Sequence, residues 1–124
     1  MFGTRFVATR ECPTHDNVKR WMMGAAETDT TVIQRSIGSN SRVIKNAASA
    51  QAAELEARNA PLEELLTVIS GDKARELLLE GTMNSGPFAC GEVVGLIPDI
   101  PTVQELVERT IAEAVAVRRK LAEL

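Results

Sequence analysis

Residues 102–124 predict a long amphipathic helix, and the rest of the fold depends on what covers it. Thr102 is expected to cap this helix, with Glu105 completing a capping box three residues later. Its apolar positions recur at helical spacing and form one stripe: Val103, Leu106, Val107, Ile111, Ala114, Val117 and Leu121. Either the middle helices of the chain cover this stripe, or a sheet that the chain does not contain covers it.

Residues 1–8 form a strand-like run that Gly3 and Thr4 interrupt. A Gly-Thr pair next to a strand can turn backbone N–H groups toward an anion, as at the phosphate sites of many cofactors. The same pair is also common in ordinary turns. A phosphate loop normally follows a strand inside a sheet, and the rest of that sheet would lie upstream. We therefore expect the sequence to be a C-terminal piece of something larger.

Composition limits the classes of protein that fit. The 124 residues suit one domain, and 14 basic and 17 acidic residues are interspersed to give a net charge of −3. This balance argues against a nucleic-acid partner and against attraction to an anionic membrane. The N-terminus lacks the pattern of a signal peptide, so a cytoplasmic location is expected. Cys12 and Cys90 lack metal-ligand spacing and are expected to be reduced, structural thiols.

Most of the middle of the chain is expected to be helical. A helix that starts after Pro13 and Thr14 should bury Val18, Trp21, Met22 and Ala25, and should place Lys19 and Arg20 on its exposed side. Residues 30–33 are β-branched and predict a short strand. Further helices are expected at 49–58, 62–69 and 73–80, with Gly71 as a C-cap and Gly81 ending the last of them.

Two side chains are candidates for chemistry, each with an ordinary alternative. His15 is the only histidine, and it either acts as a general base or caps a helix start. Glu92 lies in a Gly-rich surrounding, where burial would raise its pKa, but it can equally face solvent or pair with an arginine. The small residues at 86, 89, 91 and 95 would admit a ligand or a neighbouring backbone, or serve packing alone.

Several spaced motifs occur in one order along the chain. They are the segment Met1 to His15 (MFGTRFVATRECPTH), Glu27 to Thr30, Arg42 to Asn46, Gly91 to Ile97, and Asp99 to Thr102. Together they resemble the C-terminal part of the nitronate monooxygenases, formerly called 2-nitropropane dioxygenases. The resemblance extends over essentially the whole chain.

This resemblance implies an α/β protein: the C-terminal fragment of an FMN-binding (β/α)8 TIM barrel, mostly α-helical as an isolated chain, with part of an inserted small domain. Residues 1–15 would be the end of the last barrel strand and its phosphate loop, and 16–85 the inserted helical subdomain. Residues 86–101 would be a Gly-rich return segment and 102–124 the last barrel helix. The family oxidises alkyl nitronates with O₂ to a carbonyl compound and nitrite.

The resemblance also implies the site residues. The family's Gln-Met-Gly-Thr phosphate stretch falls on residues 1–4, which makes Gly3, Thr4 and Phe2 the expected FMN-binding residues. Cys90-Gly91-Glu92 stands where the family usually has Ala-Gly-Gln, so a carboxylate replaces a neutral amide and would repel an anionic substrate or flavin. The family's catalytic histidine belongs to a region that the sequence lacks, and His15 does not correspond to it, so no catalytic residue is assigned.

Three functional hypotheses follow. The first is the C-terminal segment of an FMN-dependent nitronate monooxygenase, inactive alone, whose missing barrel segment is a second polypeptide if the gene is split. The second keeps the flavoenzyme but changes the substrate to a quinone or an enoyl-acyl-carrier-protein thioester. The third is a non-catalytic helical interaction module. Because the helix at 102–124 would expose its stripe, weak stability or self-association into a homo-oligomer is expected.

Overall fold

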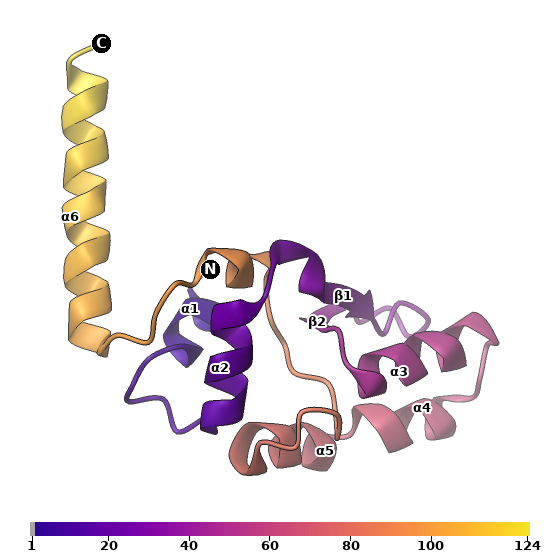
Figure 1. Cartoon of the computed structure of the whole chain (residues 1–124). Helices are drawn as coiled ribbons and strands as arrows, with labels where there is room; N and C mark the ends of the chain where they lie inside the picture. The colour runs from indigo at the N-terminus through magenta and orange to yellow at the C-terminus, as the bar shows by residue number, and fades with distance from the viewer. Residues whose placement is uncertain (1) are drawn as a thin grey trace.

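The computed structural model describes residues 2–124 as a mixed α/β arrangement that is mostly helical (Figure 1). Met1, the first residue of the expected phosphate stretch, lies outside the described residues. In chain order the elements are α1 (Gly3–Val7), α2 (Asp16–Gly24), η1 (Glu27–Asp29), β1 (Thr30–Ile33), β2 (Ser41–Ile44), α3 (Ala47–Ala57), α4 (Leu62–Ile69), α5 (Gly71–Arg75), η2 (Glu76–Glu80), η3 (Glu92–Leu96) and α6 (Val103–Ala122).

The prediction of a strand at the start of the chain is wrong, because Gly3–Val7 forms the short helix α1. The N–H of Phe6 donates to the carbonyl of Phe2 at 3.1 Å, and the two phenyl rings meet edge to face with centroids 6.2 Å apart. This i, i+4 aromatic pair stabilises a helical turn. The hydroxyl of Thr9 closes the helix end by donating to the Phe6 carbonyl at 2.7 Å. Local contacts thus outweigh the β-propensity of Phe6 and Val7.

The hairpin of β1 and β2 separates two hydrophobic clusters. The strands pair antiparallel, with Ile33 opposite Ser41 and Thr31 opposite Val43. Because successive side chains of a strand point to opposite faces, Val43 and Ile44 enter different clusters. The segment after Pro87 continues the pairing on the other edge of β2, since the N–H of Ile44 donates to the Phe88 carbonyl at 3.0 Å.

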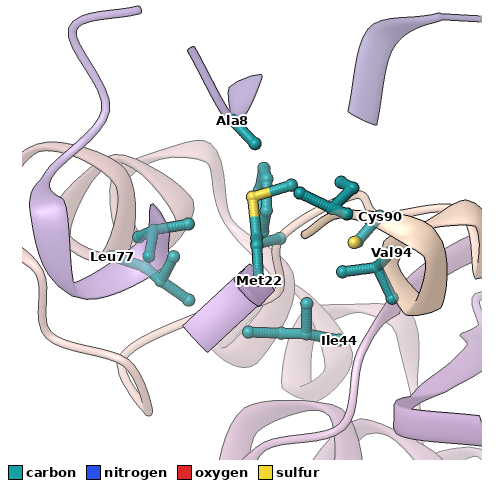
Figure 2. Close-up of a cluster of buried hydrophobic side chains, with 9 residues drawn as sticks. Ala8, Met22, Ile44, Leu77, Cys90 and Val94 are labelled. Atoms are coloured by element: carbon teal, nitrogen blue, oxygen red, sulfur yellow. The ribbon is translucent and has the colours of Figure 1, made fainter. Parts of the chain in front are cut away.

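The first cluster joins segments that are far apart in the sequence, as Figure 2 shows. Its buried members come from α2, β2, η2, η3 and the segments after α1 and around residue 90: Ala8, Val18, Met22, Ile44, Leu77, Phe88, Cys90, Val94 and Ile97. The second cluster packs α3 and α4 on the other face of the hairpin through Ile33, Val43, Ala48, Ala52, Leu55, Leu65 and Val68. The predicted buried positions Val18 and Met22 are confirmed, whereas Lys19, expected on the exposed side of α2, is only 7% exposed.

The helix α6 stands away from the rest of the chain (Figure 1). Its capping box is confirmed, because Glu105 N–H donates to the Thr102 hydroxyl while the Thr102 N–H donates to the Glu105 carboxylate. Leu106 is its only buried residue, and Ile111, Val117 and Leu121 remain 55–63% exposed. The stripe is therefore not covered by the middle helices, and self-association stays a prediction.

Ion pairs fix the base of α6. The carboxylate of Asp99 accepts from Arg5 at 2.8 Å and from Arg109 at 2.9 Å, so it joins α1 to α6. The hydrogen bond from Arg109 is the largest cause that holds the pKa of Asp99 below its usual value. The carboxylate of Glu11 adds a further tie by accepting from the Val103 N–H at 3.0 Å. No helix of the described chain, α6 included, combines the length and the apolarity needed to cross a bilayer.

Candidate functional site

A cleft of about 770 Å³ opens between α1, the start of β2 and the segment 89–93. Gly3 and Thr4 line it from α1, Arg42 lines it from β2, and Gly91 and Glu92 line it from the segment 89–93. The N–H of Gly91 donates to the Thr4 hydroxyl oxygen at 2.9 Å, which fixes α1 against the return segment. Two of the residues predicted to bind the cofactor, Gly3 and Thr4, are therefore brought to one cleft. Its volume lies in the range typical of small-molecule sites.

The backbone at Gly3 is open to an approaching group, because no atom lies within 4 Å of the place where a Cβ would be. The first N–H groups of a helix also have no acceptor within the helix. The Thr4 oxygen already accepts a hydrogen bond, so its O–H is the group that can donate into the cleft. These donors fit the oxygens of a phosphate, as the sequence predicts for this stretch.

Phe2, the third predicted cofactor-binding residue, is placed elsewhere. This residue is 57% exposed and lines a small apolar groove of about 190 Å³ with Phe6, Val107 and Ile111. The structure therefore does not bring the Phe2 side chain to the cleft of Gly3 and Thr4. The i, i+4 pairing with Phe6 turns it toward α6 instead.

Glu92 pairs with Arg42 at the edge of the same cleft. Its carboxylate lies 3.2 Å from the Arg42 guanidinium, which also donates to the Thr30 hydroxyl at 3.0 Å. The Glu92 side chain is 62% exposed, so the alternative of an arginine-paired, solvent-facing carboxylate is the correct one. Because Arg42 offsets its charge, the carboxylate repels an anion in the cleft less than the sequence alone indicates. Sequence reasoning missed Arg42, whose place opposite Glu92 depends on how the return segment pairs with β2.

The histidine has a structural role. His15 is the N-cap of α2, where Nδ1 accepts from the Asn17 N–H at 3.0 Å. Its ring also lies against Gly81, whose φ of 72° is left-handed and whose missing Cβ makes room for the imidazole. The capping alternative is therefore confirmed. Within residues 2–124, no three His, Cys, Asp or Glu side chains come together in a way that would hold a metal ion.

Both cysteines are free thiols, as predicted, and Cys90 lies where the cleft meets the first cluster. Burial raises the pKa of the Cys90 thiol from 9.0 to about 11, against a smaller lowering by the Thr4 hydroxyl. The folded state therefore keeps this thiol neutral where the unfolded chain would ionise it.

The stability of the chain is expected to fall as the pH rises from 9 to 11. Because the folded pKa is the higher one, the contribution of Cys90 is complete below pH 9 and is lost as the pH approaches 11. Two pKa units correspond to about 2 to 3 kcal/mol. Urea unfolding of wild type and Cys90→Ala across this range measures the effect, and tyrosine is absent from the sequence, so no phenol titrates in the same window. Equal pH slopes in the two proteins would contradict the assignment.

A family model and solved structures both match nearly the whole chain. The model of the nitronate monooxygenase family matches residues 1–113. The solved structure of FabK from Thermotoga maritima is 29% identical and superposes with a TM-score of 0.89, covering 97% of this chain and 38% of that one. A single-residue variant of the same protein gives 26% identity and a TM-score of 0.76, covering 97% and 34%.

A curated relative matches a shorter stretch. It is a (3aS,4S,5R,7aS)-5-hydroxy-7a-methyl-1-oxo-octahydro-1H-indene-4-carboxyl-CoA dehydrogenase of Rhodococcus jostii (strain RHA1), 42% identical over 38 residues. The match covers 31% of this chain and 11% of the relative. The chain thus spans between a third and two fifths of the FabK chains and a smaller part of this dehydrogenase. Because the family model matches 113 of the 124 residues of this chain, the chain belongs to the nitronate monooxygenase family of flavin-dependent oxidoreductases.

Proposed function

We propose that this chain forms the C-terminal part of an FMN-dependent nitronate monooxygenase, which oxidises alkyl nitronates with O₂ to a carbonyl compound and nitrite. The observation that carries the proposal is the cleft in which Gly3 and Thr4 meet Gly91 and Glu92. Gly3 and Thr4 are separated from Gly91 and Glu92 by more than 80 residues of sequence, and all four lie within the region that the family model matches.

The residues of this cleft bind and orient the cofactor. The backbone N–H groups at Gly3 and Thr4 and the Thr4 hydroxyl hold the phosphate, while Gly91, bonded to Thr4, keeps this edge of the cleft in place. The Arg42–Glu92 pair borders the same space and limits how much negative charge the cleft presents. When bound, FMN supplies the electron acceptor between the nitronate and O₂.

Residues outside these 124 supply the remainder of the (β/α)8 barrel, either in the same protein chain or in a second one. The support is the share of the FabK structure that this chain covers, 38%, together with the exposed stripe of α6. A barrel of this type needs about 250 residues and eight strands to close. As the family resemblance implies, the catalytic histidine belongs to that remainder, and His15 serves here as a helix cap.

A second candidate substrate class is a thioester. The match to a carboxyl-CoA dehydrogenase favours it. It corresponds to the enoyl-thioester reductase that the sequence leaves open as an alternative. The two candidates separate in one assay of the enzyme assembled with its complete barrel. Consumption of O₂ with an alkyl nitronate supports the first, and nicotinamide-dependent turnover of an enoyl thioester without nitronate oxidation supports the second.

The phosphate role is tested by comparing FMN with riboflavin, which lacks the phosphate, in fluorescence titrations of the 124-residue chain. We expect FMN to bind weakly but about tenfold more tightly than riboflavin, because charge-assisted hydrogen bonds contribute roughly 1.5 to 3 kcal/mol. Thr4→Val should reduce that preference and Thr4→Ser should restore it, while Thr67→Val, with its hydroxyl on the exposed face of α4, serves as the matched control.

Two results would contradict different parts of the proposal. Equal affinity for FMN and riboflavin in the wild-type chain would remove the phosphate site at Gly3 and Thr4. A tight, stoichiometric yellow complex of the chain alone would show that the remaining barrel is not needed to hold the cofactor.

A further inference from the structure

Lys19 is a buried cation without an acidic partner. Lys19 is 7% exposed, and its ammonium group donates to the Cys12 carbonyl at 2.7 Å and to the Arg10 carbonyl at 3.5 Å. Both acceptors are neutral. Across residues 2–124, no carboxylate oxygen lies within 4.0 Å of this nitrogen. Lysine is rarely buried unless it is paired, because moving its charge out of water is costly. The site therefore lacks a counter-ion.

Lys19 lines a second cleft, of about 390 Å³, which α2 forms with residues 10 and 100. Arg10 and Arg20 line this cleft as well, and neither has a carboxylate within 4.0 Å among the described residues. Asp16 is the single acid in the lining, which leaves an excess of two positive charges in a chain whose net charge is −3. Arg10 also lines the neighbouring cleft, where it adds to the lowering of the Glu105 pKa that the Thr102 N–H mainly causes. Lys19 and Arg20 line the second cleft and not that neighbouring one.

The two arginines are held in place by neutral groups. A guanidinium nitrogen of Arg20 donates to the Asn17 side-chain oxygen at 2.6 Å, and Nε of Arg10 donates to the Ile100 carbonyl at 3.4 Å. Each guanidinium has five N–H donors, so most of them stay free for a ligand. Met23 and Ile100 add an apolar surface to the same cleft.

We propose that this cleft binds a phosphate monoester dianion, which supplies the counter-ion for Lys19. Two negative charges match the excess of two positive charges, and arginine presents its donors in the geometry that phosphate oxygens accept. The volume exceeds that of a phosphate, so the organic part of the ligand lies on Met23 and Ile100. This cleft shares no lining residue with the cleft of Gly3 and Thr4, and the two sites are independent.

The first test is a titration of the chain with inorganic phosphate at constant ionic strength, followed by the fluorescence of Trp21, the neighbour of Arg20 in α2. We expect saturable binding that Arg20→Gln and Lys19→Met each weaken about tenfold, the ratio expected for one charge-assisted contact. Asp16→Asn should strengthen binding, because it removes the single acid of the lining. Lys120→Met, on exposed α6, changes the net charge equally and should leave the affinity unchanged. Arg20→Gln keeps the test decisive if Lys19→Met fails to fold.

The second test separates a phosphate monoester from other anions. Coenzyme A carries a monoester phosphate on its ribose, and dephospho-coenzyme A does not. We expect coenzyme A to bind about tenfold more tightly in wild type and to lose this advantage in Arg20→Gln. Equal affinity for the two compounds, or a phosphate response that Lys120→Met reduces as much as Arg20→Gln does, would overturn the proposal.

Discussion

Replacing Leu77 by alanine is expected to lower the free energy of unfolding by about 3 kcal/mol, within the 2 to 5 kcal/mol typical of buried leucines. Leu77 is 0% exposed and lies in the first cluster with Met22 and Val94 (Figure 2). Its removal leaves a cavity among tightly packed side chains from distant parts of the chain, so the surroundings cannot collapse easily into it. Urea denaturation followed by the fluorescence of Trp21, the single tryptophan, measures the loss.

Leu79 is the matched control for this substitution. It lies two residues further along η2 but is 48% exposed, so Leu79→Ala should cost less than about 1 kcal/mol. The ratio of the two effects matters more than either value. Similar losses for Leu77→Ala and Leu79→Ala would show that η2 is not packed as the structure describes.

Gly86→Ala is the second substitution with a large expected effect, of about 3 kcal/mol. A Cβ at Gly86 would overlap the backbone of Lys73 and Ala74 in α5, and backbone atoms cannot move aside as a side chain can. The Gly86 carbonyl also accepts from the Asn46 side chain at 2.8 Å, so the segment cannot shift away without losing that bond. Urea denaturation should therefore show a lower midpoint with an unchanged slope.

Gly71→Ala provides the comparison, because no atom lies within 4 Å of the place where its Cβ would be. Gly71 is the first residue of α5, where alanine is the better helix former. We expect Gly71→Ala to be neutral or slightly stabilising. If Gly86→Ala were equally mild, the close approach of the return segment to α5 would be wrong.

The elements that the sequence predicts correctly are those determined by local chemistry. Thr102 and Glu105 form their capping box, residues 30–33 form β1, and the helix after Pro61 appears as α4. Gly81 ends η2 with a left-handed φ, as predicted, whereas Gly71 does not cap α4 but starts α5. In these cases the deciding contacts lie within a few residues of one another, so the pattern along the chain contains them.

The elements that the sequence misses depend on distant contacts or on competing local ones. Residues 1–8 have the composition of a strand, but the Phe2–Phe6 pair makes α1 a helix. The sequence indicates that Lys19 faces solvent on α2. It is buried because the loop before α2 packs against it and accepts its hydrogen bonds through the carbonyls of Arg10 and Cys12. Periodicity along a helix cannot reveal a neighbouring loop that covers its polar face.

Some residues of the candidate site could be predicted from the sequence, and others could not. Gly3 and Thr4 are recognisable from their motif, and the structure places both on one cleft. Their partners Gly91 and Arg42 lie 87 and 38 residues from Thr4, counting along the chain, and no spacing rule connects them. The sequence therefore indicates two residues of this cleft, whose role at a phosphate stays a prediction, but not the residues that line the cleft with them.

The position of β2 between the two clusters has a consequence for how the chain tolerates mutation. Val43 supports one cluster and Ile44 the other, although the two residues are neighbours. A substitution that tilts this strand alters the packing of both clusters at once, so the side chains of one cluster cannot change without affecting the other. We therefore expect substitutions in this hairpin to affect the packing of α3 and α4 and the packing around Met22 and Val94 together.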